Sequence, residues 1–299
     1  MKTALIFSGQ GSQYVGMNEI FIKNHNEIAQ KFFDLSNQIL KYNIQDLISN
    51  GPVEKLNNTK YTQPSIFIIS AIAYEVFKNK GINADFCAGH SVGEITALYA
   101  AGALSFKEAL LFIQERADYM ETASKKNPGK MLALIKPSDK SVKSIIQKDQ
   151  SICVANINSS NQIILSGSVD SINEIIPFCK KEKIKCILLP VSGAFHSDLM
   201  KSASDSLLNT LNQLNLVDSM MPVYQNINAL PQSSNEMLRR NLKNQIISTV
   251  KWKQTIENMI KDKAAKFIEI GPKKILTNLL KKSHPNIECY SIEELILSE

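Results

Sequence analysis

The chain has 299 residues, of which 44% are hydrophobic and 21% charged, so it can bury a large core. This length exceeds that of one ordinary domain, and we expect one large domain or a domain that carries an insertion. Lys and Arg total 34 against 28 acidic residues, a formal net charge of +6. This mild excess, spread without a basic run, argues against nucleic-acid binding and allows an acidic partner.

Cysteine usage indicates a reducing compartment. The five cysteines are Cys87, Cys153, Cys179, Cys186 and Cys289. They form no CxxC pair and no metal-ligand spacing, so we expect free thiols and no metal site. The chain starts directly with a strand-like segment and has neither a cleavable signal nor an apolar stretch of membrane-spanning length. We therefore expect a cytoplasmic protein without membrane contact, or an organellar one if a transit peptide has been removed.

The first predicted strand, Ala4–Phe7, leads into the turn Gly9-Gln-Gly-Ser-Gln13. This turn lacks the Lys-Ser/Thr pair of a phosphate-binding loop and the spacing of a dinucleotide fingerprint, which excludes nucleotide binding there. We expect it to present the backbone amide of Gln10 to a reacting group.

A long apolar helix is predicted next, over Ser65–Lys80, with Pro64 at its first turn. A second strand, Asp85–Ala88, follows and runs into the pentapeptide Gly89-His-Ser-Val-Gly93 and a helix. A strand, a sharp turn and a helix in this order are typical of an α/β sheet.

The pentapeptide has the GxSxG pattern of a nucleophile elbow, in which a serine is exposed on a tight turn. Ser91 would then be the nucleophile, and the amide of Val92 would be free to bind an oxyanion. The alternative is a tight glycine turn that carries an ordinary serine.

Arg116 belongs to a helix that begins near Ser105. The apolar positions that flank it at spacings of three and four are Ala109, Phe112, Met120 and Ala123. This pattern places the guanidinium in an apolar stripe, where it needs a partner. One reading is an ion pair with Asp118 or Glu121, or an extension of the side chain to water. The other is a bidentate contact with a substrate carboxylate.

The middle of the chain has a different pattern. From Met131 to Val191 the predicted elements are strand Leu132–Ile135, helix Ser138–Gln147, strand Ile152–Asn156, strand Gln162–Ser166, helix Val169–Glu182 and strand Lys185–Leu189. This βαββαβ order predicts a ferredoxin-like subdomain, residues 129–193, inserted into a large α/β domain made of residues 1–128 and 194–299. A cleft between the two parts would be the natural ligand site.

His196 follows the insertion and could return to this cleft as a general base for Ser91. His25 and His284 lie in polar surroundings, and His90 adjoins the serine, which suggests an orienting or packing role. The elements predicted after His196 are helices near Ser197–Leu214, Glu236–Ile247 and Lys253–Lys261, and strands Val223–Asn226 and Lys266–Ile270.

Taken together, these motifs resemble those of the malonyl-CoA:acyl carrier protein transacylase family. In chain order they are Gly9-Gln-Gly-Ser-Gln13, Gly89-His-Ser-Val-Gly-Glu94, Gln114-Glu-Arg116 with Met120, Gly193-Ala-Phe-His-Ser197, Gln245 before Val250-Lys-Trp252, and Glu269-Ile-Gly-Pro272. The resemblance spans nearly the whole chain and implies an α/β-hydrolase-like core with a ferredoxin-like insertion. Ser8 departs from the family pattern, which usually has proline there.

The resemblance also implies roles for single residues. Ser91 would be the nucleophile, His196 its base, and Arg116 the ligand of the malonyl carboxylate. The amides of Gln10 and Val92 would form the oxyanion hole. The other positions that it assigns to the substrate site are Gln245, whose backbone carbonyl would orient the histidine, His90 beside the nucleophile, and Met120 and Phe195 around the acyl pocket.

The expected reaction is a ping-pong transfer of malonate from malonyl-CoA, through a serine ester, to the phosphopantetheine thiol of acyl carrier protein. It needs no resident cofactor. The alternatives are an acyltransferase with another acyl preference, a serine thioesterase and a carrier-docking module without catalysis. A malonyl or methylmalonyl preference, and a fatty-acid or polyketide carrier, stay open at this point.

Overall fold

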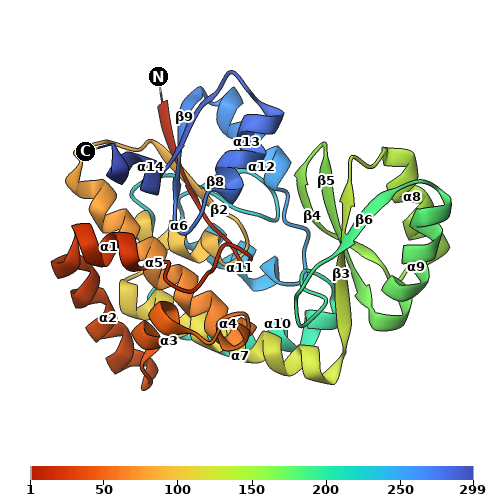
Figure 1. Cartoon of the computed structure of the whole chain (residues 1–299), viewed down its shortest axis with the longest axis horizontal. Helices are drawn as coiled ribbons and strands as arrows, with labels where there is room; N and C mark the ends of the chain where they lie inside the picture. Colours follow the sequence, from red (N-terminus) through yellow and green to blue (C-terminus); the bar gives the residue numbers. More distant parts are fainter. Residues whose placement is uncertain (1, 299) are drawn as a thin grey trace.

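Two β-sheets with flanking helices make up the structure, a computed structural model that describes residues 2–298 (Figure 1). The larger sheet has the spatial order β10 (Glu288–Ser291), β9 (Ala264–Ile270), β1 (Lys2–Phe7), β2 (Phe86–Gly89), β7 (Val223–Tyr224) and β8 (Pro231–Gln232). Neighbouring strands run parallel, except that β8 is antiparallel to β7. The predicted α/β class is confirmed.

Strand β1 is buried on both faces, as a central strand of a parallel sheet must be. Ala4 and Ile6 point to one side, where they pack with α12 (Trp252–Lys261) and α13 (Ile275–Ser283). Leu5 and Phe7 point to the other side and join the main core. That core is formed largely by α5 (Thr59–Asn79), α6 (Gly93–Ala100) and α7 (Phe106–Lys126). Because helices pack on both faces of the sheet, the ends of β1 and β2, and the turns that follow them, are held in place.

The start predicted for the long apolar helix is wrong. Helix α5 begins at Thr59, and Pro64 lies inside it. The side chain of Asn58 accepts a hydrogen bond from the amide of Lys60 at 3.0 Å and so caps the first turn. Pro64 removes one hydrogen bond within the helix, but burial of the surrounding apolar residues keeps the helix continuous.

Four helices precede α5, and no sequence pattern predicted them. They are α1 (Glu19–Asn24), α2 (Asn26–Leu40), α3 (Ile44–Asn50) and α4 (Val53–Leu56). They are the red and orange helices in the lower left part of the view, with α4 nearest the middle (Figure 1). The C-terminal elements α13, β10 and α14 (Ile292–Leu297) were also not predicted.

The second sheet and the two helices that cover it are the six elements predicted for the middle of the chain. These are β3 (Gly129–Ile135), α8 (Asp139–Lys148), β4 (Cys153–Ser159), β5 (Gln162–Ser168), α9 (Val169–Lys181) and β6 (Lys185–Leu188). The sheet is antiparallel with the order β4-β5-β3-β6, and α8 and α9 cover one face. The main chain of Val250 exchanges hydrogen bonds with Ala155 and Ile157 and so ties this sheet to the rest of the molecule.

After β6 the chain returns to the larger part. A single 3₁₀ turn, Asp198–Met200, leads into α10 (Lys201–Gln213), and α11 (Asn235–Gln245) precedes α12. All five cysteines are free thiols, as expected. Among residues 2–298, no helix has both the length and the apolar composition needed to cross a bilayer.

Candidate active site

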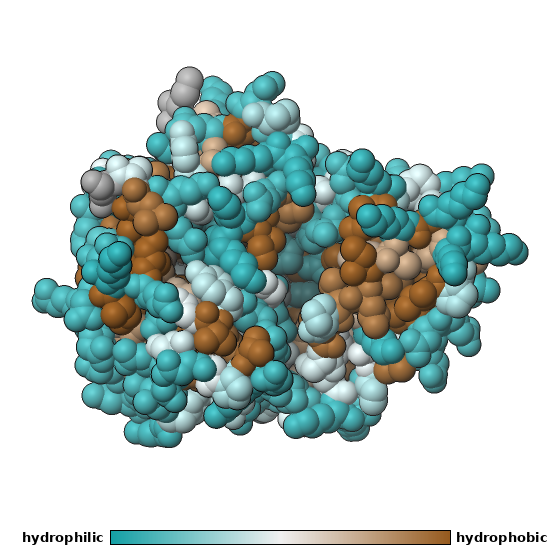
Figure 2. Space-filling model, in the orientation of Figure 1, coloured by the Kyte–Doolittle hydropathy of each residue, from teal (hydrophilic) through white to brown (hydrophobic). Residues whose placement is uncertain are grey.

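The surface is hollowed between the part built on the larger sheet and the part built on the smaller one (Figure 2). A cavity of about 250 Å³ lies here. Its lining comes from both parts of the chain and comprises Gln10, Gln63, His90, Ser91, Val92, Met120, Met131, Asn156, Asn158, Gln162, Ile164, Leu189, Val191, Phe195, His196 and Ile275. The structure thus gathers at one cavity most of the site residues that the sequence predicted.

Ser91 lies on the sharp turn between β2 and α6. Its φ of 52° is in the left-handed region, which is unfavourable for a residue with a side chain. The turn is also too tight for side chains at its ends, since a Cβ on Gly89 would lie 1.9 Å from the backbone of Gly93. This geometry exposes the Ser91 hydroxyl to the cavity, as the GxSxG pattern predicts.

His196 reaches Ser91 from the segment after the smaller sheet. Its Nε2 lies 2.9 Å from Ser91 Oγ. Its Nδ1 lies 3.0 Å from the carbonyl oxygen of Gln245 and 3.1 Å from that of Ser248. Both of these atoms are acceptors, so Nδ1 carries the hydrogen and Nε2 is left to accept the hydroxyl proton.

The environment of His196 favours the neutral ring. Burial lowers its pKa to about 3, and the positive charge of Arg116 adds to this effect, although the two carbonyls act in the opposite direction. The imidazole therefore stays unprotonated at neutral pH, which is the form that a general base requires.

Two backbone amides at the cavity have no hydrogen-bond acceptor among residues 2–298. They belong to Gln10, on the turn after β1, and to Val92, just after Ser91. Unpaired amides beside a nucleophile are the groups that an oxyanion hole needs.

Arg116 is 1% exposed and projects from α7 toward Ser91. Its Nη1 donates to Gln63 Oε1 at 2.6 Å, and its Nη2 donates to Gln245 Oε1 at 3.0 Å and to Ser91 Oγ at 3.2 Å. Its Nε is buried and has no hydrogen-bond partner within residues 2–298. Burial lowers its pKa to about 10, so the guanidinium remains charged at neutral pH.

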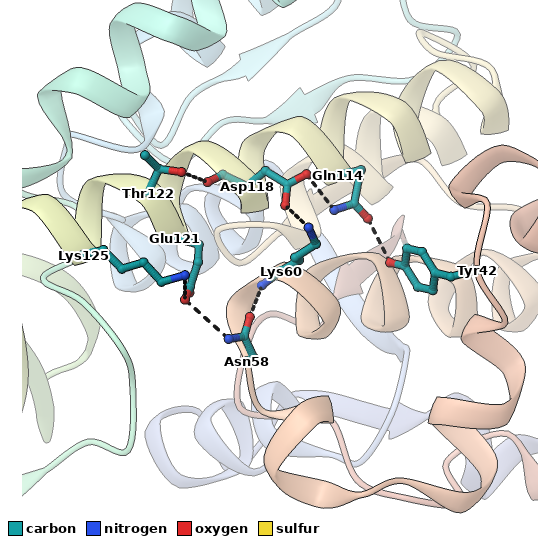
Figure 3. A network of polar contacts seen from close by, with 8 residues as sticks. All are labelled: Tyr42, Asn58, Lys60, Gln114, Asp118, Glu121, Thr122 and Lys125. Carbon is teal, nitrogen blue, oxygen red and sulfur yellow. Dashed lines mark hydrogen bonds and ion pairs between the residues drawn. The ribbon is translucent and has the colours of Figure 1, made fainter.

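The alternative partners of Arg116 on its own helix are engaged elsewhere (Figure 3). Asp118 forms an ion pair with Lys60 at 3.2 Å. Glu121 pairs with Lys125 at 3.4 Å and accepts a hydrogen bond from Asn58. Neither carboxylate touches Arg116, so the ion-pair reading of this residue is wrong, and so is an extension to water, because the side chain is buried.

The remaining predicted residues lie around these groups. His90 turns away from Ser91: its Nε2 lies 2.8 Å from Asn158 Oδ1, and its ring meets the edge of Trp252. Burial lowers the pKa of His90. Met120 and Phe195 are buried and form part of the apolar wall of the cavity.

Sequence reasoning missed three polar side chains of the site. Gln63 binds Arg116, Asn226 binds the backbone on either side of His90, and Glu94 is buried beneath the turn. Glu94 was part of the recognised motif but had no assigned role. Gln63 and Asn226 lie in no motif, so only the folded chain reveals them.

No group of three or more potential metal ligands occurs among residues 2–298. The donor set at the cavity is serine, neutral histidine, arginine and amides, and this set can activate a hydroxyl and hold an anion. It can therefore support acyl transfer through a serine ester.

Comparisons with known proteins agree with this chemistry. Residues 4–296 match the family model described as acyl transferase domain. The chain is 34% identical to the malonyl CoA-acyl carrier protein transacylase of Bacillus subtilis, over 98% of this chain and 94% of the relative. It is likewise 34% identical to that of a Synechocystis species, over 99% and 98%.

Solved structures give the same result. An acyl-carrier-protein-S-malonyltransferase from Bartonella henselae superposes with a TM-score of 0.94 at 30% identity and covers 100% of this chain and 98% of its own. A malonyl-transacylase in complex with a type II PKS acyl-carrier protein superposes with a TM-score of 0.95 at 28% identity, with the same coverage. The chain belongs to the acyl transferase domain family.

Proposed function

We propose that this protein transfers the malonyl group from malonyl-CoA to the phosphopantetheine thiol of acyl carrier protein, with a malonyl ester of Ser91 as intermediate. The observation that carries the proposal is a buried arginine that contacts no carboxylate among residues 2–298 and lies 3.2 Å from the hydroxyl of Ser91. The same hydroxyl also contacts the neutral histidine. The names of relatives that match nearly the whole chain support the same reaction, and we propose that it serves fatty-acid synthesis.

In the first half-reaction, Ser91 Oγ attacks the thioester carbonyl while His196 Nε2 takes the hydroxyl proton. Negative charge develops on the carbonyl oxygen, where the amides of Gln10 and Val92 stabilise it. The carbon–sulfur bond then breaks, and the imidazolium returns its proton to the coenzyme A thiolate. The product is the malonyl ester of Ser91.

Arg116 selects an acyl group that carries a second carboxylate. The two ends of its guanidinium now hold Gln63 and Gln245, and a bidentate contact with the malonyl carboxylate would displace Ser91 Oγ from Nη2. Met120 and Phe195 bound the space next to this carboxylate and so restrict substituents on the malonyl carbon.

In the second half-reaction, the carrier thiol attacks the ester, and His196 takes the thiol proton and returns it to Ser91 Oγ. No resident cofactor is required, because the base, the oxyanion donors and the carboxylate ligand all come from the chain. A serine thioesterase would share Ser91 and His196, but a buried cation for the acyl tail brings no advantage to simple hydrolysis.

We further propose an α/β-hydrolase-like core, residues 1–128 and 194–299, with a ferredoxin-like insertion, residues 129–193. The sheet orders and the βαββαβ sequence of elements support this division. Free thiols and a substrate made inside cells support a location in the cytoplasm.

Incubation with malonyl-CoA, methylmalonyl-CoA and acetyl-CoA, followed by mass spectrometry, tests the function. We expect one malonyl mass on the peptide that contains Ser91 and its discharge when holo carrier protein is added. Steady hydrolysis faster than transfer would identify a thioesterase, a stronger methylmalonyl or acetyl signal another acyltransferase, and no added mass a docking module.

A further inference from the structure

The side chain of Asn226 brackets the turn that carries the nucleophile. Its Oδ1 accepts a hydrogen bond from the amide of Ser91 at 2.8 Å, and its Nδ2 donates to the carbonyl of Gly89 at 2.7 Å. The residue is 1% exposed, so no solvent competes for these bonds. One amide group thus joins the last residue of β2 to the strained residue that follows His90.

Glu94 fixes the position of Asn226. One carboxylate oxygen accepts the backbone amide of Asn226 at 2.5 Å, and the other accepts Gln225 Nε2 at 3.3 Å. Glu94 is fully buried on the first turn of α6. Gln225 is held in turn by Asn241 at 2.7 Å. The carboxylate therefore anchors the segment after β7 directly beneath the nucleophile.

A second side chain holds Ser91 from the opposite end. The side-chain Nε2 of Gln245 donates to the backbone carbonyl of Ser91 at 3.0 Å, and the backbone carbonyl of Gln245 accepts a hydrogen bond from His196 Nδ1. The amide and the carbonyl of the nucleophile are thus each bound by a buried side-chain amide. A residue with φ of 52° returns to a relaxed conformation unless its surroundings hold it.

We propose that Asn226, seated by Glu94, is a positioning residue that keeps Ser91 in the conformation in which its hydroxyl meets His196. This inference rests on the proposed function, because it concerns the formation of the malonyl ester on Ser91. Asn226 does not line the cavity, so it acts on the attack and leaves the binding of malonyl-CoA unchanged.

The test is single-turnover acylation of the full chain by malonyl-CoA, with substrate binding measured separately by calorimetry. For Asn226→Ala we expect the acylation rate constant to fall about a hundredfold, which is the loss that a misplacement of about 1 Å can cause. The dissociation constant for malonyl-CoA should change less than about threefold, since the Arg116 contacts persist.

Two further variants separate positioning from a packing defect. Asn226→Asp keeps the size and the acceptor for the Ser91 amide, but places a carboxylate oxygen against the Gly89 carbonyl; we expect at least a tenfold loss of rate. Glu94→Gln keeps the shape but replaces one acceptor with a donor, and we expect a loss in the same direction of about three- to tenfold.

A fluorophosphonate reagent, which labels reactive serines without any acyl carboxylate, gives an independent readout. Its reaction with Ser91 should slow in parallel with acylation in all three variants. Asn18→Ala is the matched control, because Asn18 is a buried amide that donates to Ser49 at 2.7 Å and neither residue lines the cavity. It should leave both rates unchanged.

Thermal unfolding of each variant identifies any that do not fold, and Asn226→Asp replaces Asn226→Ala in that case. Unchanged acylation in folded Asn226 variants would overturn the inference, as would a loss confined to malonyl-CoA binding. If the unmodified protein forms no ester on Ser91, the proposed function fails instead, and the two failures are therefore distinguishable.

Discussion

In the proposed function, Arg116 is the residue that would separate a dicarboxylic acyl transferase from an ordinary serine hydrolase. Its side chain is buried, yet its hydrogen bonds within the described part of the chain go to neutral groups: two glutamine oxygens and one hydroxyl. The negative charge of Glu94 raises the pKa of Arg116, against the larger effect of burial. Burial of a cation without a contacting anion is unfavourable, so a substrate carboxylate that binds to Arg116 would supply the missing charge–charge attraction.

Arg116→Ala should lower kcat/KM for malonyl transfer at least a hundredfold, because the carboxylate loses its bidentate ligand. Acetyl transfer should be unchanged or faster, since acetate has no tail to bind and the pocket loses a charge. Transfer assays with both donors measure this ratio. Arg116→Lys is the control for charge without the planar fork, and an equal loss for both donors would contradict the assigned role.

The pKa of His196 makes a separate prediction about stability. Burial lowers it to about 3 in the folded chain, against an ordinary value near 6.5 when unfolded. Between these values the unfolded chain binds a proton that the folded chain does not, so this contribution to stability is complete above pH 6.5 and is lost as the pH falls toward 3.

Urea unfolding of the unmodified protein and His196→Gln between pH 7.5 and 4.5 tests this directly. The free energy of unfolding of the unmodified protein should fall relative to the variant by an amount on the order of 2 kcal/mol. Glu94, whose pKa burial raises to about 7, is present in both proteins and cancels. Parallel curves would show that His196 titrates normally in the folded state.

The sequence was sufficient to predict the site residues that lie in motifs. It was insufficient to predict the residues that hold them in position. The GxSxG turn alone indicates the place of Ser91, and the place of His196 follows from its position just after the insertion, where the chain returns to the larger part. Asn226 and Gln63 carry no local signal, because each is an amide whose partner lies far away in the chain. Their importance comes from tertiary structure alone.

At the scale of elements, α7 is the support of Arg116, and its start is marked by a capping box. Ser105 Oγ accepts the amide of Glu108 at 3.2 Å, and the Glu108 carboxylate accepts the amide of Ser105 at 3.1 Å. Two otherwise unpaired donors of the first turn are thereby satisfied. The pattern is local, which is why the beginning of this helix was predicted correctly.

Ser105→Ala should lower the free energy of unfolding by about 1 kcal/mol, because the cap is lost while the rest of the helix persists. Chemical denaturation measures the change. Ser202→Ala, on the exposed side of α10, is the matched control and should stay within about 0.5 kcal/mol of the unmodified protein. Equal effects of both substitutions would argue against the cap.

Elements without such local signals were misjudged. Pro64 favours a helix start on its own, but Asn58 caps α5 one and a half turns earlier, and burial overrides the missing hydrogen bond. Helices α1, α3 and α4 are short, and the four helices α1–α4 pack on one another, on α5 and, through α2, on α7. In contrast, the four strands of the smaller sheet and its two helices have clear local patterns, and each was predicted within a few residues.

At the scale of the whole molecule, the geometry of the active site depends on the two places where the chain passes between the sheets. Gly129 opens β3 at the first crossing, and Ala194 follows the second one. They touch: a Cβ added to Gly129 would lie 2.5 Å from that of Ala194 and 2.7 Å from the carbonyl of Gly167. His196 lies just beyond this contact, so the crossing sets its distance from Ser91.

Gly129→Ala should therefore move the second crossing and separate His196 from Ser91. We expect acylation to slow at least tenfold, with a loss of about 1–3 kcal/mol in unfolding free energy from overpacking. Gly167→Ala is the matched control, because its Cβ would meet the movable side-chain atoms of Ile152 at 3.1 Å instead of backbone. If Gly129→Ala lowers stability while acylation per folded molecule is unchanged, the crossing does not set the catalytic distance.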